Sequence, residues 1–177
     1  MSILPGTIVL DVRDHTVGLD VEGGGDYELP VGPLELVAGP LEHADMPAPE
    51  QLTNAIALVQ DHLDDLLIEA PSIAAAPAVV AAGEHARVLA MVELGADAVP
   101  TGYRLERHAA DEVFRTLVVE PISDRVANPG LPSSHVESII GTCCVILGVM
   151  RRLDLRHVDI AGSDAAPSDR PTDTTGR

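Results

Sequence analysis

The sequence contains no lysine and no tryptophan, and it has one phenylalanine and two tyrosines among 177 residues. So few aromatic side chains cannot build the stacking platform on which single-stranded nucleic acids bind. Every positive charge is an arginine, and 11 of them stand against 28 aspartates and glutamates, for a formal net charge of −17. A surface of that sign repels nucleic acids and anionic membranes, so we expect neither as a partner.

Cysteine and long apolar segments are also scarce. Cys143 and Cys144 are adjacent within an apolar stretch, which predicts buried, unreactive thiols rather than a disulfide framework or a metal site. No apolar run reaches the ~18 residues that a membrane-spanning helix needs. The first residues lack the basic and apolar regions of a secretion signal. We therefore expect a cytoplasmic protein with no membrane partner.

Three short strands are predicted near the N-terminus by apolar and polar alternation. The sequence Gly23-Gly24-Gly25 separates the second strand from the third. A phosphate-binding loop should lead into a helix, so these glycines are interpreted as a hairpin turn. The three strands are expected at residues 6–12, 17–22 and 27–31.

The rest of the chain alternates predicted helices with buried strands. Apolar residues at steps of three and four predict the helices. Gly95 is expected to end one helix, and Ser133 or Ser134 to cap the last. The helices are expected at 50–69, 84–94, 106–119 and 135–153, and the strands at 76–83 and 156–162. This order predicts a mixed α/β sheet with helices packed on it.

Domain boundaries follow from composition. Residues 6–162 carry all of the predicted elements and form one expected domain, preceded by a short segment at residues 1–5. Residues 163–177 are rich in Asp, Pro, Ser and Thr and are predicted to be a disordered tail.

Five segments, in this order along the chain, resemble the C-terminal lobe of the exopolyphosphatase / guanosine pentaphosphate phosphatase (Ppx/GppA) family. The resemblance implies an actin-like ATPase (ribonuclease H-like) lobe, with three N-terminal antiparallel strands in a mixed sheet and helices packed on it. The segments are LDVRDHTVGL at Leu10–Leu19, ELPVGPLEL at Glu28–Leu36, VVAAGEHARVLAM at Val79–Met91, TGYRLERHAADEVFRTL at Thr101–Leu117 and a long segment at Asn128–Asp164 that begins NPGLPSSHVESIIG.

The phosphate loop of that family is altered here. In the family pattern D-I-G-G-G-S, glycines let the backbone approach phosphate and metal. Asp11 matches the aspartate and Thr16 keeps a hydroxyl, but Arg13, Asp14 and His15 replace the glycines. The Asp14 carboxylate stands where the phosphate is expected, and like charges repel strongly away from water. Arg13 is expected to offset part of that charge.

The second loop departs in the same way. Its G-G-T pattern falls on Gly83, Glu84 and His85, so one glycine remains and a further carboxylate is added. The resemblance therefore implies two degenerate phosphate loops.

The same residues also suggest a metal site. Asp11, Asp14 and His15, facing Glu84 and His85, could form a new site for Mg²⁺, Mn²⁺ or Zn²⁺. The alternative is a set of polar residues at the mouth of an eroded cleft. Similarly, Ser133-Ser134-His135 is interpreted as a helix cap rather than as a nucleophile and its base, and most of the seven histidines as surface residues.

Two functions follow from the resemblance, besides the third possibility that the likeness is fortuitous. The first is a one-lobe, non-catalytic binding or regulatory module, with a homodimer or a separate first-lobe chain as its partner. The alternative is an exopolyphosphatase-type phosphoanhydride hydrolase, active only when another chain supplies the first lobe. Asp11 and Thr16 would then contribute, with Mg²⁺ as cofactor and polyphosphate or guanosine pentaphosphate (pppGpp) as substrate.

Overall fold

The computed structural model describes residues 6–162, so the segment 1–5 and the predicted tail 163–177 lie outside the described residues. The described chain opens with three antiparallel strands, in which Val12 pairs with Val17, and Val17 with Leu29. Gly23 has a φ of 78° in the turn before the third strand, a conformation that favours glycine. The strands are β1 (Ile8–Val12), β2 (Val17–Val21) and β3 (Asp26–Leu29), which confirms the predicted hairpins.

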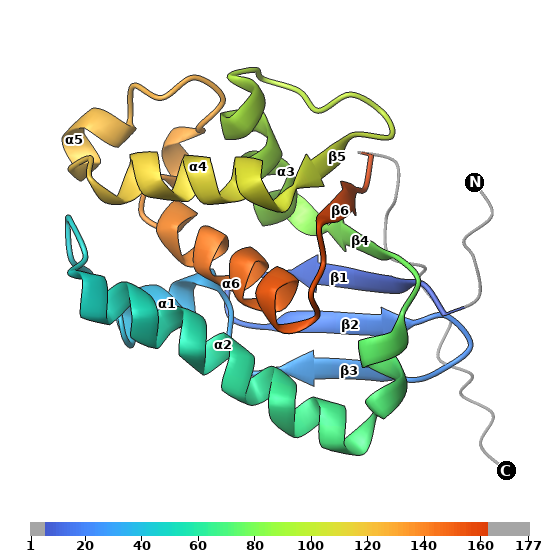
Figure 1. The fold of residues 1–177 in the computed structure, drawn as a ribbon. Helices are drawn as coiled ribbons and strands as arrows, with labels where there is room; N and C mark the ends of the chain where they lie inside the picture. The colour runs from blue at the N-terminus through green and yellow to red at the C-terminus, as the bar shows by residue number, and fades with distance from the viewer. Residues whose placement is uncertain (1–5, 163–177) are drawn as a thin grey trace, which may run out of the picture.

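Three further strands complete the sheet. β4 (Val79–Ala82) is parallel to β1, β6 (His157–Ile160) is parallel to β4, and β5 (Arg104–Glu106) is antiparallel to β6. The order across the sheet is β3-β2-β1-β4-β6-β5 (Figure 1). The predicted mixed sheet is therefore confirmed.

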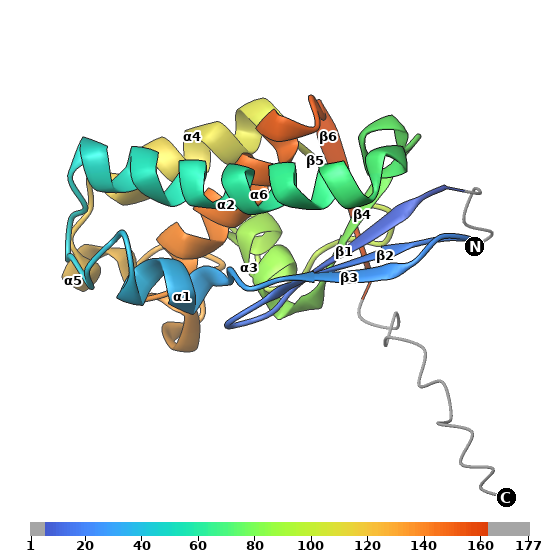
Figure 2. The same cartoon turned by 90° about the horizontal axis from the view of Figure 1, so that it is seen from below.

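The last long helix, α6 (Ile139–Arg152), is the centre of the core. Every residue from Ile139 to Met150 is buried, because α6 contacts α1, α2, α3 and α4. Figure 2 shows α2, α4 and α6 stacked on one side of the first three strands. The other helices are α1 (Pro33–Ala38), α2 (Pro49–Glu69), α3 (Gly83–Leu94), α4 (Arg107–Val118) and α5 (Ile122–Arg125), with short 3-10 turns at η1 (Pro71–Ala75) and η2 (Ser133–His135).

Several local predictions need correction. The prediction that Ser133 or Ser134 caps the long helix is wrong, because Pro132 has an extended backbone and starts the separate turn η2, and α6 begins only at Ile139. Helix α1 is absent from the predicted elements; it starts at Pro33, since proline suits the first turn of a helix. Gly95 does end α3, in a left-handed conformation, as predicted.

The two cysteines lie inside α6 and are fully buried, as the sequence predicted. Burial raises the pKa of both thiols, that of Cys144 to about 12, so both stay protonated at neutral pH. In the part of the chain that the structure describes, no helix combines the length and the apolar character needed to cross a membrane.

The contact between α2 and α6 predicts a test of the fold. A Cβ added at Gly148 would lie 2.9 Å from Val59 Cγ1, closer than carbon atoms normally approach. We expect Gly148→Ala to lower the free energy of unfolding by ~1–3 kcal/mol, measured by urea denaturation. In a Val59→Ala background the loss should be smaller, because Cγ1 is gone and only the Val59 Cβ remains in close contact, 3.0 Å from the added atom, while alanine favours a helix by about 1 kcal/mol over glycine. Equal destabilisation in both backgrounds would contradict this packing.

Candidate functional site

Two loops meet at one edge of the sheet, because β1 and β4 are parallel and their carboxyl ends lie side by side. The first loop is Arg13–Thr16, between β1 and β2, and the second is the turn from β4 into α3 at Gly83. Gly83 has a φ of 87°, and a Cβ there would lie 2.8 Å from the Val12 carbonyl oxygen and 2.9 Å from Asp11 Oδ1. The glycine therefore lets the two loops touch.

Arg13 folds back over the sheet. Its Nε donates to Asp11 Oδ2 at 2.7 Å, and its Nη1 donates to Glu28 Oε2 at 3.1 Å. Strand register aligns Asp11, Gly18 and Glu28 across β1, β2 and β3, and the missing side chain of Gly18 leaves room for the guanidinium. The expectation that Arg13 offsets the charge of Asp14 is thus wrong, because Arg13 neutralises Asp11 and Glu28 instead.

Asp14 reaches the second loop. Its Oδ1 lies 2.8 Å from Nε2 of His85, and Nδ1 of His85 lies 3.0 Å from the Thr142 hydroxyl on α6. The carboxylate can only accept, so Nε2–H donates to it. His85 is 4% exposed and Thr142 is 1% exposed, whereas the Asp14 side chain is 65% exposed. The hydrogen-bonded side chains of Asp14, His85 and Thr142 therefore run from the surface into the core.

This hydroxyl, imidazole and carboxylate have the connectivity of a nucleophilic triad, but in the wrong orientation for one. In such a triad the hydroxyl must reach the substrate. Here the hydroxyl of Thr142 is buried, and its oxygen also lies 3.2 Å from the Ser138 carbonyl oxygen, so its one hydrogen has two competing acceptors, that oxygen and His85 Nδ1. The exposed end is the carboxylate. The arrangement fastens the first loop to α3 and α6.

The same loop is held by α1. The backbone N–H of Leu34 donates to the Asp14 carbonyl at 2.8 Å. A Cβ at Gly32 would lie 2.5 Å from that carbonyl oxygen, so the backbones are in direct contact. Residues 13–16 are therefore fixed from three sides.

A second imidazole packs against the first. The rings of His85 and His135 meet edge to face at 5.0 Å. Burial, and then the neighbouring His85, lower the pKa of His135, while Glu84 and Asp14 act in the opposite direction. The Ser134 hydroxyl lies 3.0 Å from His135 Nδ1, and Glu84 Oε1 lies 4.0 Å from Nε2, beyond hydrogen-bond distance. His135 is therefore a neutral base at pH 7.

The metal site that was one of two alternatives at Asp11, Asp14 and His15 is not assembled in the described part of the chain. Asp11 accepts from Arg13, Asp14 pairs with His85, and the exposed His15 pairs with Glu35 at 2.7 Å. These donors have separate partners, and within residues 6–162 no three His, Cys, Asp or Glu side chains are grouped so as to hold a metal ion. The residues at this edge do not fit a resident Mg²⁺.

Sequence reasoning missed Glu28, Glu35 and Thr142. The two glutamates lie in segments that read as an ordinary strand and turn. Thr142 had a visible signal, because it follows Gly141 as a polar residue inside an apolar helix. The burial of His85 and His135 was also missed, since it depends on contacts between distant parts of the chain.

Comparison with known proteins places this fold. No family model and no curated protein matches the chain. Among solved structures, an exopolyphosphatase-like protein has a TM-score of 0.78 at 16% identity and covers 89% of this chain and 56% of its own. The Ppx-GppA enzyme of Aquifex aeolicus has a TM-score of 0.75 at 14% identity, covering 88% and 53%. An exopolyphosphatase from Cytophaga hutchinsonii has a TM-score of 0.68 at 12% identity, covering 88% and 53%.

The chain thus has an actin-like ATPase fold. More particularly, it has the fold found in about half of each Ppx/GppA structure, and it spans about half the length of the solved structures it matches. The resemblance seen in the sequence is confirmed at the level of the fold.

The Asp14–His85 contact predicts a measurable coupling. In a double-mutant cycle with Asp14→Ala and His85→Ala, we expect an interaction energy of ~1–2 kcal/mol in urea denaturation, because one partner is buried. The pair His15 and Glu35 is a matched control, since it lies in the same loop at 2.7 Å but is exposed. Its cycle should give below ~0.5 kcal/mol. Equal coupling in the two cycles would show that the buried contact is absent.

His135 predicts a pH dependence. Its folded-state pKa is lower than the ordinary 6.5, so the unfolded chain binds the proton more tightly. Stability should therefore fall as the pH drops below about 6.5, and His135→Gln should remove part of that loss. Titration of the imidazole ¹³C signals by NMR gives the pKa directly. A titration midpoint of His135 at or above pH 6.5 would contradict the lowered pKa expected of a buried ring beside His85.

Proposed function

We propose that this chain is a one-lobe relative of the Ppx/GppA phosphatases that acts as a non-catalytic binding or regulatory module. The fold and the names of its structural neighbours, which include exopolyphosphatases, support the relationship. The observation that carries the non-catalytic part is the 2.8 Å contact between Asp14 and His85, which links the two loops that match the family's phosphate loops.

The contact opposes phosphate binding for two reasons. A phosphate between these loops would meet the carboxylates of Asp11, Asp14 and Glu84, and the nearest cation, Arg13, is already engaged by Asp11 and Glu28. One backbone N–H of the loop is also engaged, since that of Arg13 donates to the Thr16 carbonyl at 3.0 Å. Phosphoanhydride hydrolysis needs donors and cations aimed at the transferred group, and here they are directed elsewhere.

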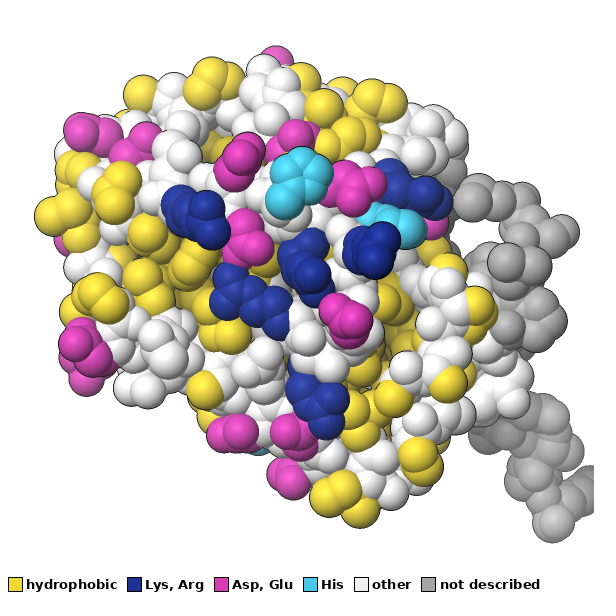
Figure 3. All heavy atoms as spheres, in the orientation of Figure 1, with side chains coloured by type: hydrophobic (Ala, Val, Ile, Leu, Met, Phe, Trp, Pro, Cys, Tyr) yellow, Lys and Arg dark blue, Asp and Glu magenta, His cyan; other side chains and the backbone are white. Residues whose placement is uncertain are grey.

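A protein is the partner class that the proposal favours, either a second copy of this chain or a separate chain carrying a first lobe. The net charge of −17 disfavours the binding of nucleic acid, polyphosphate and pppGpp. We also propose a cytoplasmic location for the protein. Figure 3 shows arginines lying beside carboxylates rather than in a single-sign patch. Three of the ion pairs in the structure are Arg104–Asp159, Arg107–Asp154 and Arg151–Asp111.

One observation favours the second function, a phosphoanhydride hydrolase completed by a first lobe. Asp11 and Thr16, the two residues that match the family pattern, both remain at the loop edge, and the Asp11 side chain lies against Gly83. A first lobe would then have to bring its own cations and displace Arg13 from Asp11.

The deciding experiment measures phosphate release from polyphosphate and from pppGpp with Mg²⁺. Wild-type protein and the Asp11→Asn variant are compared, alone and after addition of a separately produced first lobe from a Ppx/GppA protein. We expect no release above that of the variant in either case. Turnover that is lost in Asp11→Asn would overturn the non-catalytic proposal, and turnover only with the added lobe would establish the second function.

A further inference from the structure

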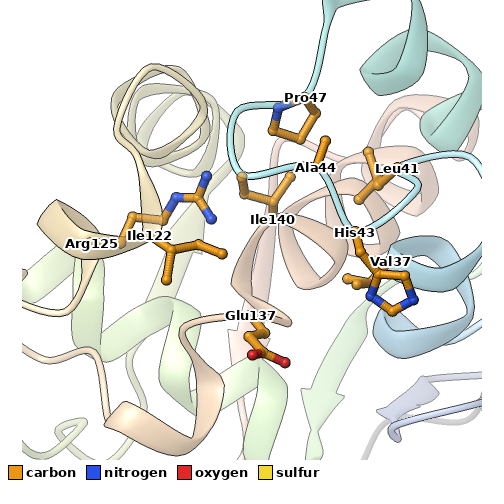
Figure 4. Close-up of a pocket in the computed structure, with 9 residues that line it drawn as sticks. All are labelled: Val37, Leu41, His43, Ala44, Pro47, Ile122, Arg125, Glu137 and Ile140. Carbon is orange, nitrogen blue, oxygen red and sulfur yellow. The ribbon is translucent and has the colours of Figure 1, made fainter.

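A cavity lies outside the two loops, and none of its lining residues belongs to them. It has a volume of about 100 Å³ and lies between the segment after α1, the short helix α5 and the first turn of α6 (Figure 4). Polar and apolar groups share its walls almost equally, and the apolar lining residues include Val37, Leu41, Ile122 and Ile140. Two exposed polar side chains, His43 and Glu137, also line it, so the cavity opens between them.

Arg125 is the buried polar group of this cavity, and it is 1% exposed. Its Nε donates to the carbonyl oxygens of Leu117 at 3.1 Å and Glu120 at 3.0 Å, and its Nη2 donates to the Asp45 carbonyl. A guanidinium has five N–H donors. Within residues 6–162 Nη1 has no acceptor, and the guanidinium points into the cavity (Figure 4).

The positive charge of Arg125 is also left without an ion pair in the described part of the chain. On the loop that faces Arg125, Asp45 uses its Oδ1 to accept the Ile122 N–H at 2.6 Å and makes no ion pair with Arg125 within residues 6–162. Burial lowers the pKa of Arg125, while Asp45 and Glu120 act against that shift from a distance. Buried cations in proteins are normally paired with an anion.

We propose that this cavity binds a short-chain aliphatic monocarboxylate, whose carboxylate accepts hydrogen bonds from Nη1 of Arg125. The planar guanidinium matches a carboxylate, and the apolar lining residues match a chain of a few carbons. The cavity volume of about 100 Å³ limits the ligand to a small one. A phosphate dianion is disfavoured, because it needs more donors than Nη1 supplies and its double charge is repelled by Glu137 more strongly than the single charge of a carboxylate.

This proposal is independent of the proposed function, because it uses none of the loop residues. The test is a titration of ¹⁵N-labelled protein with isobutyrate, followed by NMR, at constant ionic strength. Isobutyramide, which has the same shape without the charge, and inorganic phosphate are titrated in parallel. We expect saturable shifts at the Arg125 Nε–H and at Ile122 and Ile140, with an isobutyrate affinity at least tenfold higher than that of either comparison compound.

A variant that fills the cavity provides a second test of the proposal. Ala44 lines the cavity and makes no side-chain hydrogen bond, so Ala44→Leu occupies the space without removing a partner of Arg125. It should weaken isobutyrate binding at least tenfold. Ala98→Leu, at an exposed position outside the lining, is the matched control and should leave the affinity unchanged.

The wild-type comparison decides the proposal even if Ala44→Leu does not fold. Absence of saturable shifts, equal binding of isobutyramide, or tighter binding of phosphate would each overturn it. Retained binding in a folded Ala44→Leu variant would also overturn it, since the ligand would then lie elsewhere.

Discussion

The close approach of α6 to its neighbours is the constraint on which the rest of the structure depends. At Gly141 an added Cβ would lie 2.3 Å from the Pro33 carbonyl oxygen, so the start of α1 rests directly on the α6 backbone. α1 in turn holds the first loop through the bond from Leu34 to Asp14. The position of α6 therefore determines where the first loop lies and how deeply Thr142 is buried. It also determines where Ile140 lines the Arg125 cavity.

At the loop edge, the side chains that could have faced a ligand satisfy one another instead. Arg13 bridges β1 and β3, Asp14 joins the first loop to α3, and His15 joins it to α1 through Glu35. In a phosphate-binding loop the donors point at an anion and the protein leaves that space open. Here the three internal contacts make residues 13–16 a structural joint between β1, β3, α1 and α3.

Much of the fold could be predicted because its signals are local. Alternation revealed the strands at Ile8–Val12 and Val17–Val21, steps of three and four revealed α2, and a long apolar run revealed α6. Elements such as β5 and α5 are too short to show a period, and they exist because neighbouring elements hold them. Similarly, the two residues of the Asp14–His85 contact are 71 positions apart, and Arg125 in the sequence ISDR looks like a surface residue until α5 is packed.

The sheet ends at β3, and the composition of that strand affects how copies of the protein can meet. Asp26 and Glu28 alternate along its four residues and are exposed. A free strand edge normally invites a neighbouring chain to add its own strand, and charged side chains are the usual protection against this. Two molecules meeting at β3 would bring these carboxylates together, so the edge resists both continuous sheets and the fibrous aggregation to which they lead.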